Sequence, residues 1–111
     1  MKVRLILSAE FTRKFKRLAK KYRSLPTDYL ALSNELKANP FIGTDLGNGI
    51  RKVRMAITSK GKGKSGGARV LTLNILVSDD AEVTLLTIYD KNEIDNVSDE
   101  YISWLVSEAK K

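Results

Sequence analysis

Residues 68–89, ARVLTLNILVSDDAEVTLLTIY, decide the fold of this 111-residue chain. Aliphatic and β-branched side chains dominate two runs in it, Ala68–Val77 and Glu82–Tyr89, and runs of this composition and length predict strands. The short segment between them, residues 78–81, is polar and predicts the turn of a hairpin. The stretch therefore indicates an antiparallel strand pair around which the rest of the chain is arranged.

Two further segments alternate between apolar and basic side chains, which is the period of a strand with one buried face. They are residues 2–7 (KVRLIL) and residues 50–57 (IRKVRMAI). In the second of them, Lys52 and Arg54 lie on the face opposite the apolar side chains. Both segments are predicted to be strands.

Three segments place apolar residues at helical spacing. The first begins at Ser8 or Glu10, the second has Pro26 in its first turn and ends at Asn39-Pro40, and the third is capped by Ser98. We expect the first two to form a helical hairpin, so that the strand after them runs antiparallel to the first strand. The order β-α-α-β-β-β-α predicts one α+β domain over residues 1–111. Its sheet is expected to have four antiparallel strands, with an N-terminal helical hairpin and a C-terminal helix.

The composition excludes several kinds of chemistry. The chain contains neither histidine nor cysteine, which excludes Ser-His and Cys-His catalysis, thiolate nucleophiles, disulfides and zinc sites built from these residues. No other set of metal ligands is evident in the sequence, and we expect no metal and no cofactor. No run is long and apolar enough to cross a membrane, and the opening MKVRLILSAE is a poor signal peptide. The expected location is the cytoplasm.

The net charge of +7 is concentrated in one stretch. Between Arg51 and Arg69 there are seven basic residues and no acid, whereas the rest of the chain has thirteen of each sign. A second basic block runs from Arg13 to Arg23, and nine of the thirteen acids fall between Asp79 and Glu108. This dipolar pattern predicts a polyanionic partner, with nucleic acid favoured over a membrane surface.

Basic residues from three strands are expected to share one sheet face. Lys52 and Arg54 are two residues apart on one strand, hence roughly 7 Å apart on the same face. Arg69 begins the next strand, and Tyr89 and Lys91 stand at the end of the one after it. If these strands are adjacent, one face carries cations and a phenol while the helices cover the other face. Such a face suits an RNA backbone with a developing negative charge, although simple solvation is the alternative. The segment 59–67 (SKGKGKSGG) is expected to be a flexible basic loop, and it lacks the spacing of a nucleotide-binding P-loop.

The segments that carry a family resemblance are residues 50–70 (IRKVRMAITSKGKGKSGGARV), residues 36–40 with Gly43, and residues 88–91 (IYDK). They resemble toxins of the RelE/ParE superfamily, particularly its HigB-like branch. The resemblance implies a toxin of a type II toxin–antitoxin system that enters the ribosomal A site and cuts mRNA, with the ribose 2′-OH as nucleophile. No set of metal ligands is evident in the sequence, so we expect the cleavage to need no metal ion. By motif, Lys52, Arg54 and Arg69 match family positions that orient the scissile phosphate, and Lys91 and Tyr89 are the further residues expected to be catalytic. The side chains expected to bind RNA are Arg51, Lys60, Lys62, Lys64, Arg13 and Lys20.

The resemblance departs from the family motif near the C-terminus. Asn92 follows Lys91 where the family has an arginine, and Tyr89 or Tyr101 would have to replace the family's tyrosine of the last helix. The implied partners are mRNA, ribosomal RNA of the small subunit, and a cognate antitoxin, a small DNA-binding protein with an acidic segment. Two alternatives stay open: a ParE-like gyrase inhibitor, and a non-catalytic basic module that only binds nucleic acid.

Overall fold

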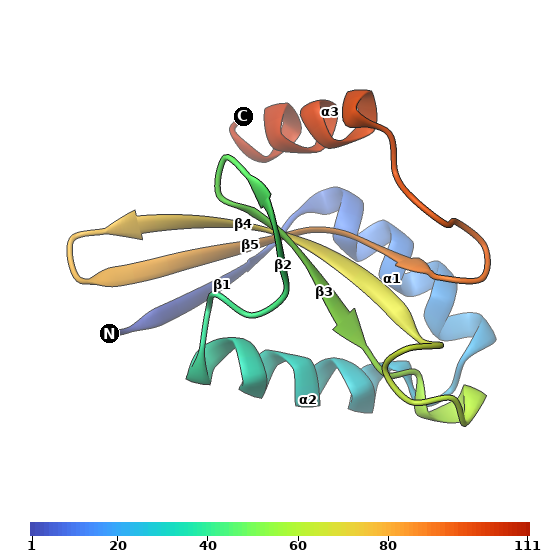
Figure 1. The fold of residues 1–111 in the computed structure, drawn as a ribbon. Coiled ribbons are helices and arrows are strands. Elements are labelled where there is room, and N and C mark those ends of the chain that lie inside the picture. The colour runs from blue at the N-terminus through green and yellow to red at the C-terminus, as the bar shows by residue number, and fades with distance from the viewer.

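The computed structural model describes all 111 residues and is built from one sheet and three α-helices (Figure 1). In chain order the elements are β1 (Val3–Leu7), α1 (Ala9–Lys21), α2 (Leu25–Ala38), β2 (Thr44–Gly47), β3 (Ile50–Met55), the 3-10 helix η1 (Thr58–Lys60), β4 (Ala68–Val77), β5 (Asp80–Asp90) and α3 (Asp99–Ala109). The mixed α+β class and the helical hairpin agree with the sequence prediction.

The prediction of four antiparallel strands is wrong in two respects. The sheet has five strands in the order β1-β5-β4-β3-β2, and β1 pairs with β5 in parallel. The extra strand, β2, pairs with β3 and has no buried residue, so it lacks the apolar alternation by which a strand is recognised.

The parallel pairing follows from the path of the helical hairpin. Helices α1 and α2 carry the chain across the width of the sheet, and β2 begins at the edge opposite β1 (Figure 1). Strands β3, β4 and β5 then return as an antiparallel meander, and the last of them lies beside β1. The first strand therefore meets the last one and not, as predicted, the strand that follows the helices.

Helices cover both faces of the sheet, which also differs from the prediction. Side chains of α1 and α2 pack with Val53, Val70, Val83 and other residues on one face. On the other face, Leu105 of α3 packs in a smaller cluster with Ile50, Leu71, Leu73, Leu86 and Tyr89. Lys52 and Arg54 lie on this second face, because their strand alternates. The last helix thus covers part of the face that carries the predicted site.

Capping residues define the helix ends as predicted. The hydroxyl of Ser8 accepts a hydrogen bond from the backbone N–H of Phe11, and that of Ser98 accepts one from Tyr101. Pro26 lies in the first turn of α2. None of the helices combines the length and the apolar character that crossing a membrane requires.

Candidate nucleic-acid interface

Four of the five predicted catalytic residues lie on one face of the sheet, which we call the cation face. Arg54 of β3 is directly opposite Arg69 of β4, and Arg69 is directly opposite Tyr89 of β5. Lys52 is two residues from Arg54 on the same strand. Directly opposite residues in neighbouring strands have Cβ atoms about 5 Å apart, so these side chains form one group.

Arg54 and Lys52 are the accessible members of this group. Arg54 is exposed, Lys52 is half-buried, and neither forms an ion pair with any acid of the chain. Unpaired cations on a structured surface repel one another and attract anions. The arrangement can bind a phosphate without breaking any internal contact.

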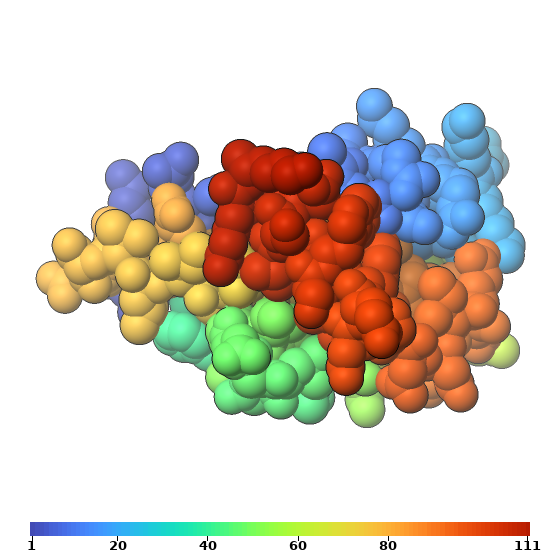
Figure 2. Space-filling view, turned by 90° about the horizontal axis from the view of Figure 1, so that it is seen from above, coloured from blue at the N-terminus to red at the C-terminus, as the bar shows by residue number.

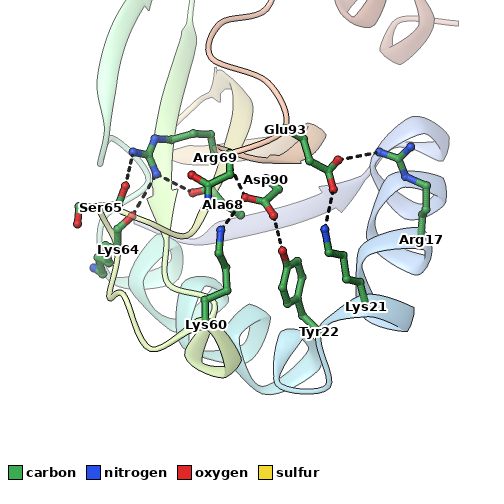
Figure 3. A network of polar contacts seen from close by, with 11 residues as sticks. Arg17, Lys21, Tyr22, Lys60, Lys64, Ser65, Ala68, Arg69, Asp90 and Glu93 are labelled. Atoms are coloured by element: carbon green, nitrogen blue, oxygen red, sulfur yellow. Dashed lines mark hydrogen bonds and ion pairs between the residues drawn. The ribbon is translucent and has the colours of Figure 1, made fainter.

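Arg69, in contrast, is buried, and its guanidinium is hydrogen-bonded within the protein. Only 7% of the residue is exposed, and its guanidinium donates three hydrogen bonds of 3.1 Å to the backbone carbonyls of Lys64, Ser65 and Ala68 (Figure 3). Burial lowers the pKa of Arg69, and the positive charge of Arg54 lowers it further. The guanidinium stays protonated at neutral pH and holds the basic loop against the sheet.

The segment 59–67, predicted to be a flexible basic loop, is instead anchored to the rest of the protein at several points. Lys60 forms an ion pair of 2.8 Å with Asp90, and the hydroxyl and backbone of Ser59 are hydrogen-bonded to Ser24. The carbonyl of Gly67 accepts a hydrogen bond from the backbone N–H of Lys91. A side chain on Gly67 would overlap the carbonyl oxygen of Met55, which explains a glycine immediately before this strand.

Asp90 connects three parts of the chain. Its carboxylate accepts hydrogen bonds from Lys60, from the hydroxyl of Tyr22 at 2.6 Å and from the backbone N–H of Asn92 (Figure 3). Burial alone would raise the pKa of Asp90, but the hydrogen bonds from Lys60 and Tyr22 outweigh it and the pKa lies below its ordinary value. The carboxylate therefore ties α1, the basic loop and the end of β5 together as a charged group.

The hydroxyl of Tyr89 has no hydrogen-bond partner within the protein. The residue is 4% exposed and its hydroxyl oxygen is fully buried. A buried hydroxyl without a hydrogen-bond partner is unusual in a protein interior. Burial raises the pKa of Tyr89, with Arg69 acting in the opposite direction. At neutral pH the phenol keeps its proton, and in this structure its oxygen is not accessible to solvent.

The predicted RNA-binding residues fall into two groups. Four of them are engaged within the protein: Arg51 pairs with Asp45, Lys60 with Asp90, Lys64 with Glu35, and Arg13 with Glu10. Lys62 and Lys20 are exposed and form no ion pair, as is also true of the predicted catalytic residue Lys91. The side chain of Lys60 is 9% exposed, so its ammonium does not face solvent in this structure.

Sequence reasoning missed a second polar network, which holds α3 on the sheet. Tyr101 of α3 donates a hydrogen bond of 2.7 Å to Glu10 of α1, and its oxygen lies 3.1 Å from the hydroxyl of Thr87. Burial would raise the pKa of Glu10, but hydrogen bonds from Tyr101 and Arg13 lower it below its ordinary value. Glu10 and Tyr101 are 91 positions apart in the sequence, so no local sequence pattern could have predicted their contact.

The chain has no group of three or more acidic, histidine or cysteine side chains that could hold a metal ion. Fold and site together define a small basic α+β protein that presents unpaired cations on one face of its sheet. The family profile described as "RelE toxin of RelE / RelB toxin-antitoxin system" matches residues 10–111. The chain belongs to this family of toxins, and the family implies a cognate antitoxin as its partner.

Proposed function

We propose that this toxin is a cytoplasmic, ribosome-dependent mRNA endoribonuclease that needs no metal ion. The observation that supports the proposal best is the cation face, where Lys52 and Arg54 are unpaired and Arg69 lies directly beside them in the sheet. Catalysis of phosphoryl transfer requires mainly positioning and positive charge around the phosphate, and such a face supplies both. The HigB-like branch of the superfamily is the proposed assignment.

The proposed reaction uses the ribose next to the scissile phosphate. The 2′-OH loses its proton and attacks phosphorus, the bond to the 5′-oxygen of the next nucleotide breaks, and that oxygen takes up a proton. The products are a 2′,3′-cyclic phosphate and a free 5′-OH. Arg54 and Lys52 stabilise the charge on the non-bridging oxygens, and Lys91 extends the positive surface from the end of β5.

Arg69 and Tyr89 receive different roles from the accessible cations. The guanidinium of Arg69 is bound to loop carbonyls, so we assign it as a positioning residue for the basic loop and for Arg54. The phenol of Tyr89 is protonated at neutral pH because burial raises its pKa, so we do not assign it as the general base. Its oxygen is buried, so its proposed role as a hydrogen-bond donor to RNA requires that RNA binding expose it.

The cation face also suggests how the antitoxin neutralises the toxin. We propose a small DNA-binding antitoxin whose acidic segment covers Lys52 and Arg54 and excludes RNA by charge pairing and sterically. Lys62 and Lys91 are exposed at the same end of the sheet and would extend this contact.

The experiment that tests the proposal is cell-free translation with the purified protein, followed by primer extension on the mRNA. The intact chain is compared with Lys52→Ala and Arg54→Ala, both of which leave the internal ion pairs intact. We expect ribosome-dependent cuts that are lost or strongly reduced in both variants. Arrest of translation without cuts would overturn the nuclease proposal, and a change in DNA supercoiling would then favour gyrase as the target.

A further inference from the structure

The segment that joins β5 to α3, residues 91–98, passes beside α1, and we call it the strap. In Figure 2 it lies at the surface, in orange, next to α1, in blue, and leads into α3, in red. Its ion pairs with α1 are made by Glu93, whose carboxylate lies 3.7 Å from the guanidinium of Arg17 and 3.4 Å from the ammonium of Lys21 (Figure 3). The two cations are one helical turn apart, so both reach the same carboxylate.

Few other contacts hold the strap in place. Residues 95–97 form no hydrogen bond, and the backbone N–H groups of Glu93 and Ile94 bond only to the carbonyl of Asp90, immediately before the strap. The side chain of Glu93 is 37% exposed, and those of Arg17 and Lys21 are 60% and 59% exposed. Exposed ion pairs are weak and are screened by salt, so a competing anion can replace the carboxylate of Glu93 at small cost.

The strap covers part of the cluster in which the phenol of the cation face is buried. Ile94 and Val97 pack against the apolar cluster that contains Tyr89. Two clefts, of about 610 Å³ and about 310 Å³, share Tyr89, Asn96 and Val97 in their linings. The hydroxyl of Tyr89 is buried without a partner, which costs free energy as long as the strap is closed. Opening the strap would give this hydroxyl access to water or to RNA and remove the cost.

The basic face of α1 suits a polyanion as the competitor of Glu93. Lys14 and Lys20 on the same helix form no ion pair, and Glu93 is the only acid outside α1 that pairs with its cations. A carboxylate between two cations occupies the position that a phosphate would take. The phosphates of an RNA strand lie in a closely spaced row, so they can bind all four cations at once, which one carboxylate cannot do.

We propose that the strap is closed in the free toxin and that ribosomal RNA opens it by displacing Glu93 from Arg17 and Lys21. Phosphates bound to these two cations release the strap, and its release uncovers Tyr89 at the cation face. The inference rests on the proposed function and adds its regulation. Docking on the ribosome then completes the site, so that cutting is restricted to mRNA that the ribosome holds.

Glu93→Gln and Glu82→Gln are matched variants, because each removes one carboxylate that lies 3.4 Å from a cation of another element. The rate at which tetranitromethane nitrates each tyrosine is followed by mass spectrometry of the peptides. We expect Tyr89 to be nitrated roughly fivefold or more faster in Glu93→Gln than in the intact chain, and at an unchanged rate in Glu82→Gln. Tyr29, which packs on Phe11 and Phe15, should keep its rate in both variants and so exclude general unfolding. Equal rates for Tyr89 in the two variants would overturn the inference.

A double variant, Arg17→Gln with Lys21→Gln, tests whether ribosomal RNA is the competitor. It breaks the same ion pairs but also removes the two cations, so we expect faster nitration of Tyr89 together with ribosome-dependent cutting slowed roughly tenfold or more. Glu93→Gln should cut at least as fast as the intact chain. Equal cutting by the double variant and Glu93→Gln would overturn the role of ribosomal RNA.

The two readouts also separate the strap from the nuclease proposal. If the intact chain makes no cuts yet Tyr89 responds to Glu93→Gln, the nuclease proposal fails and the strap stands. If the intact chain cuts mRNA and Tyr89 does not respond, the strap fails and the nuclease proposal stands.

Discussion

Lys60 and Asp90 form an ion pair of 2.8 Å in which both partners are withdrawn from solvent, with side chains 9% and 1% exposed. Lys64 and Glu35 form a pair of 2.9 Å in the same part of the molecule, with side chains 54% and 40% exposed. Both lysines belong to the same basic loop. The two pairs therefore differ mainly in burial, which makes them a controlled comparison.

We expect Lys60→Met to destabilise the protein much more than Lys64→Met. Removing Lys60 leaves the carboxylate of Asp90 buried without a counter-charge, a loss of about 3–5 kcal/mol, whereas an exposed pair contributes about 0–1 kcal/mol. The free energy of unfolding in urea measures both. Similar losses for the two variants would contradict the assignment of Lys60 as a structural residue.

The same carboxylate predicts a pH dependence of stability. The folded pKa of Asp90 lies below its ordinary value of 3.8, so the carboxylate stabilises the fold above that value and this contribution is lost as pH falls through the folded pKa. Glu10, also shifted below its ordinary value of 4.5, acts in the same direction. Urea unfolding from about pH 7 to about pH 2.5 should show the loss below about pH 4. Asp90→Asn should be less stable at neutral pH but lose less on acidification; an unchanged acid slope would contradict the role of Asp90.

Two tyrosines provide a further paired test. The hydroxyl of Tyr101 is hydrogen-bonded to Glu10 and lies close to Thr87, whereas that of Tyr89 has no partner. We expect Tyr101→Phe to cost about 1.5–3 kcal/mol of unfolding free energy, because a hydrogen bond to a charged group is lost. Tyr89→Phe should be neutral or stabilising by up to about 1 kcal/mol, because it removes an unsatisfied group. Thermal and urea unfolding distinguish them, and a large loss for Tyr89→Phe would show that its hydroxyl has a partner in the free protein.

Arg54 and Arg69 are neighbours across two strands, but we expect their variants to differ. Arg54 is exposed and unpaired, so Arg54→Ala should change stability by less than about 0.5 kcal/mol while abolishing cutting. Arg69→Ala should cost about 2–4 kcal/mol, because three backbone carbonyls, two of them in the loop, lose their donor and a buried side chain is removed. Cutting and urea unfolding are measured on both variants. Equal stability of the two would contradict the positioning role of Arg69.

Much of the fold could be predicted because its signals are local. The alternation in residues 50–55 identifies β3, the serines at 8 and 98 mark helix starts, and the polar turn near residue 79 joins β4 to β5. Strand β2 was missed because all four of its side chains are exposed. The parallel pairing of β1 with β5 was missed because it joins residues about eighty positions apart. The apolar pattern within one strand does not indicate which other strand it pairs with.

The candidate site divides in the same way. The two-residue period of a strand is enough to place Lys52 and Arg54 on one face, and their types are enough to indicate a phosphate ligand. Which of the basic side chains are free to bind a phosphate could not be predicted from the sequence. Lys60 and Lys62 are indistinguishable in sequence, yet one is buried against Asp90 and the other is free.

The sequence by itself determined the element types, the basic face and the absence of histidine and cysteine chemistry, because each depends on residue identity or on a period of a few residues. Only the tertiary structure decided that Arg69 supports a loop, that Tyr89 carries an unpaired hydroxyl, and that α3 forms a cleft beside Lys52. The physical reason is that burial and pairing depend on which distant segments meet. In this protein the order of the strands in the sheet and the position of α3 determine which distant segments are in contact.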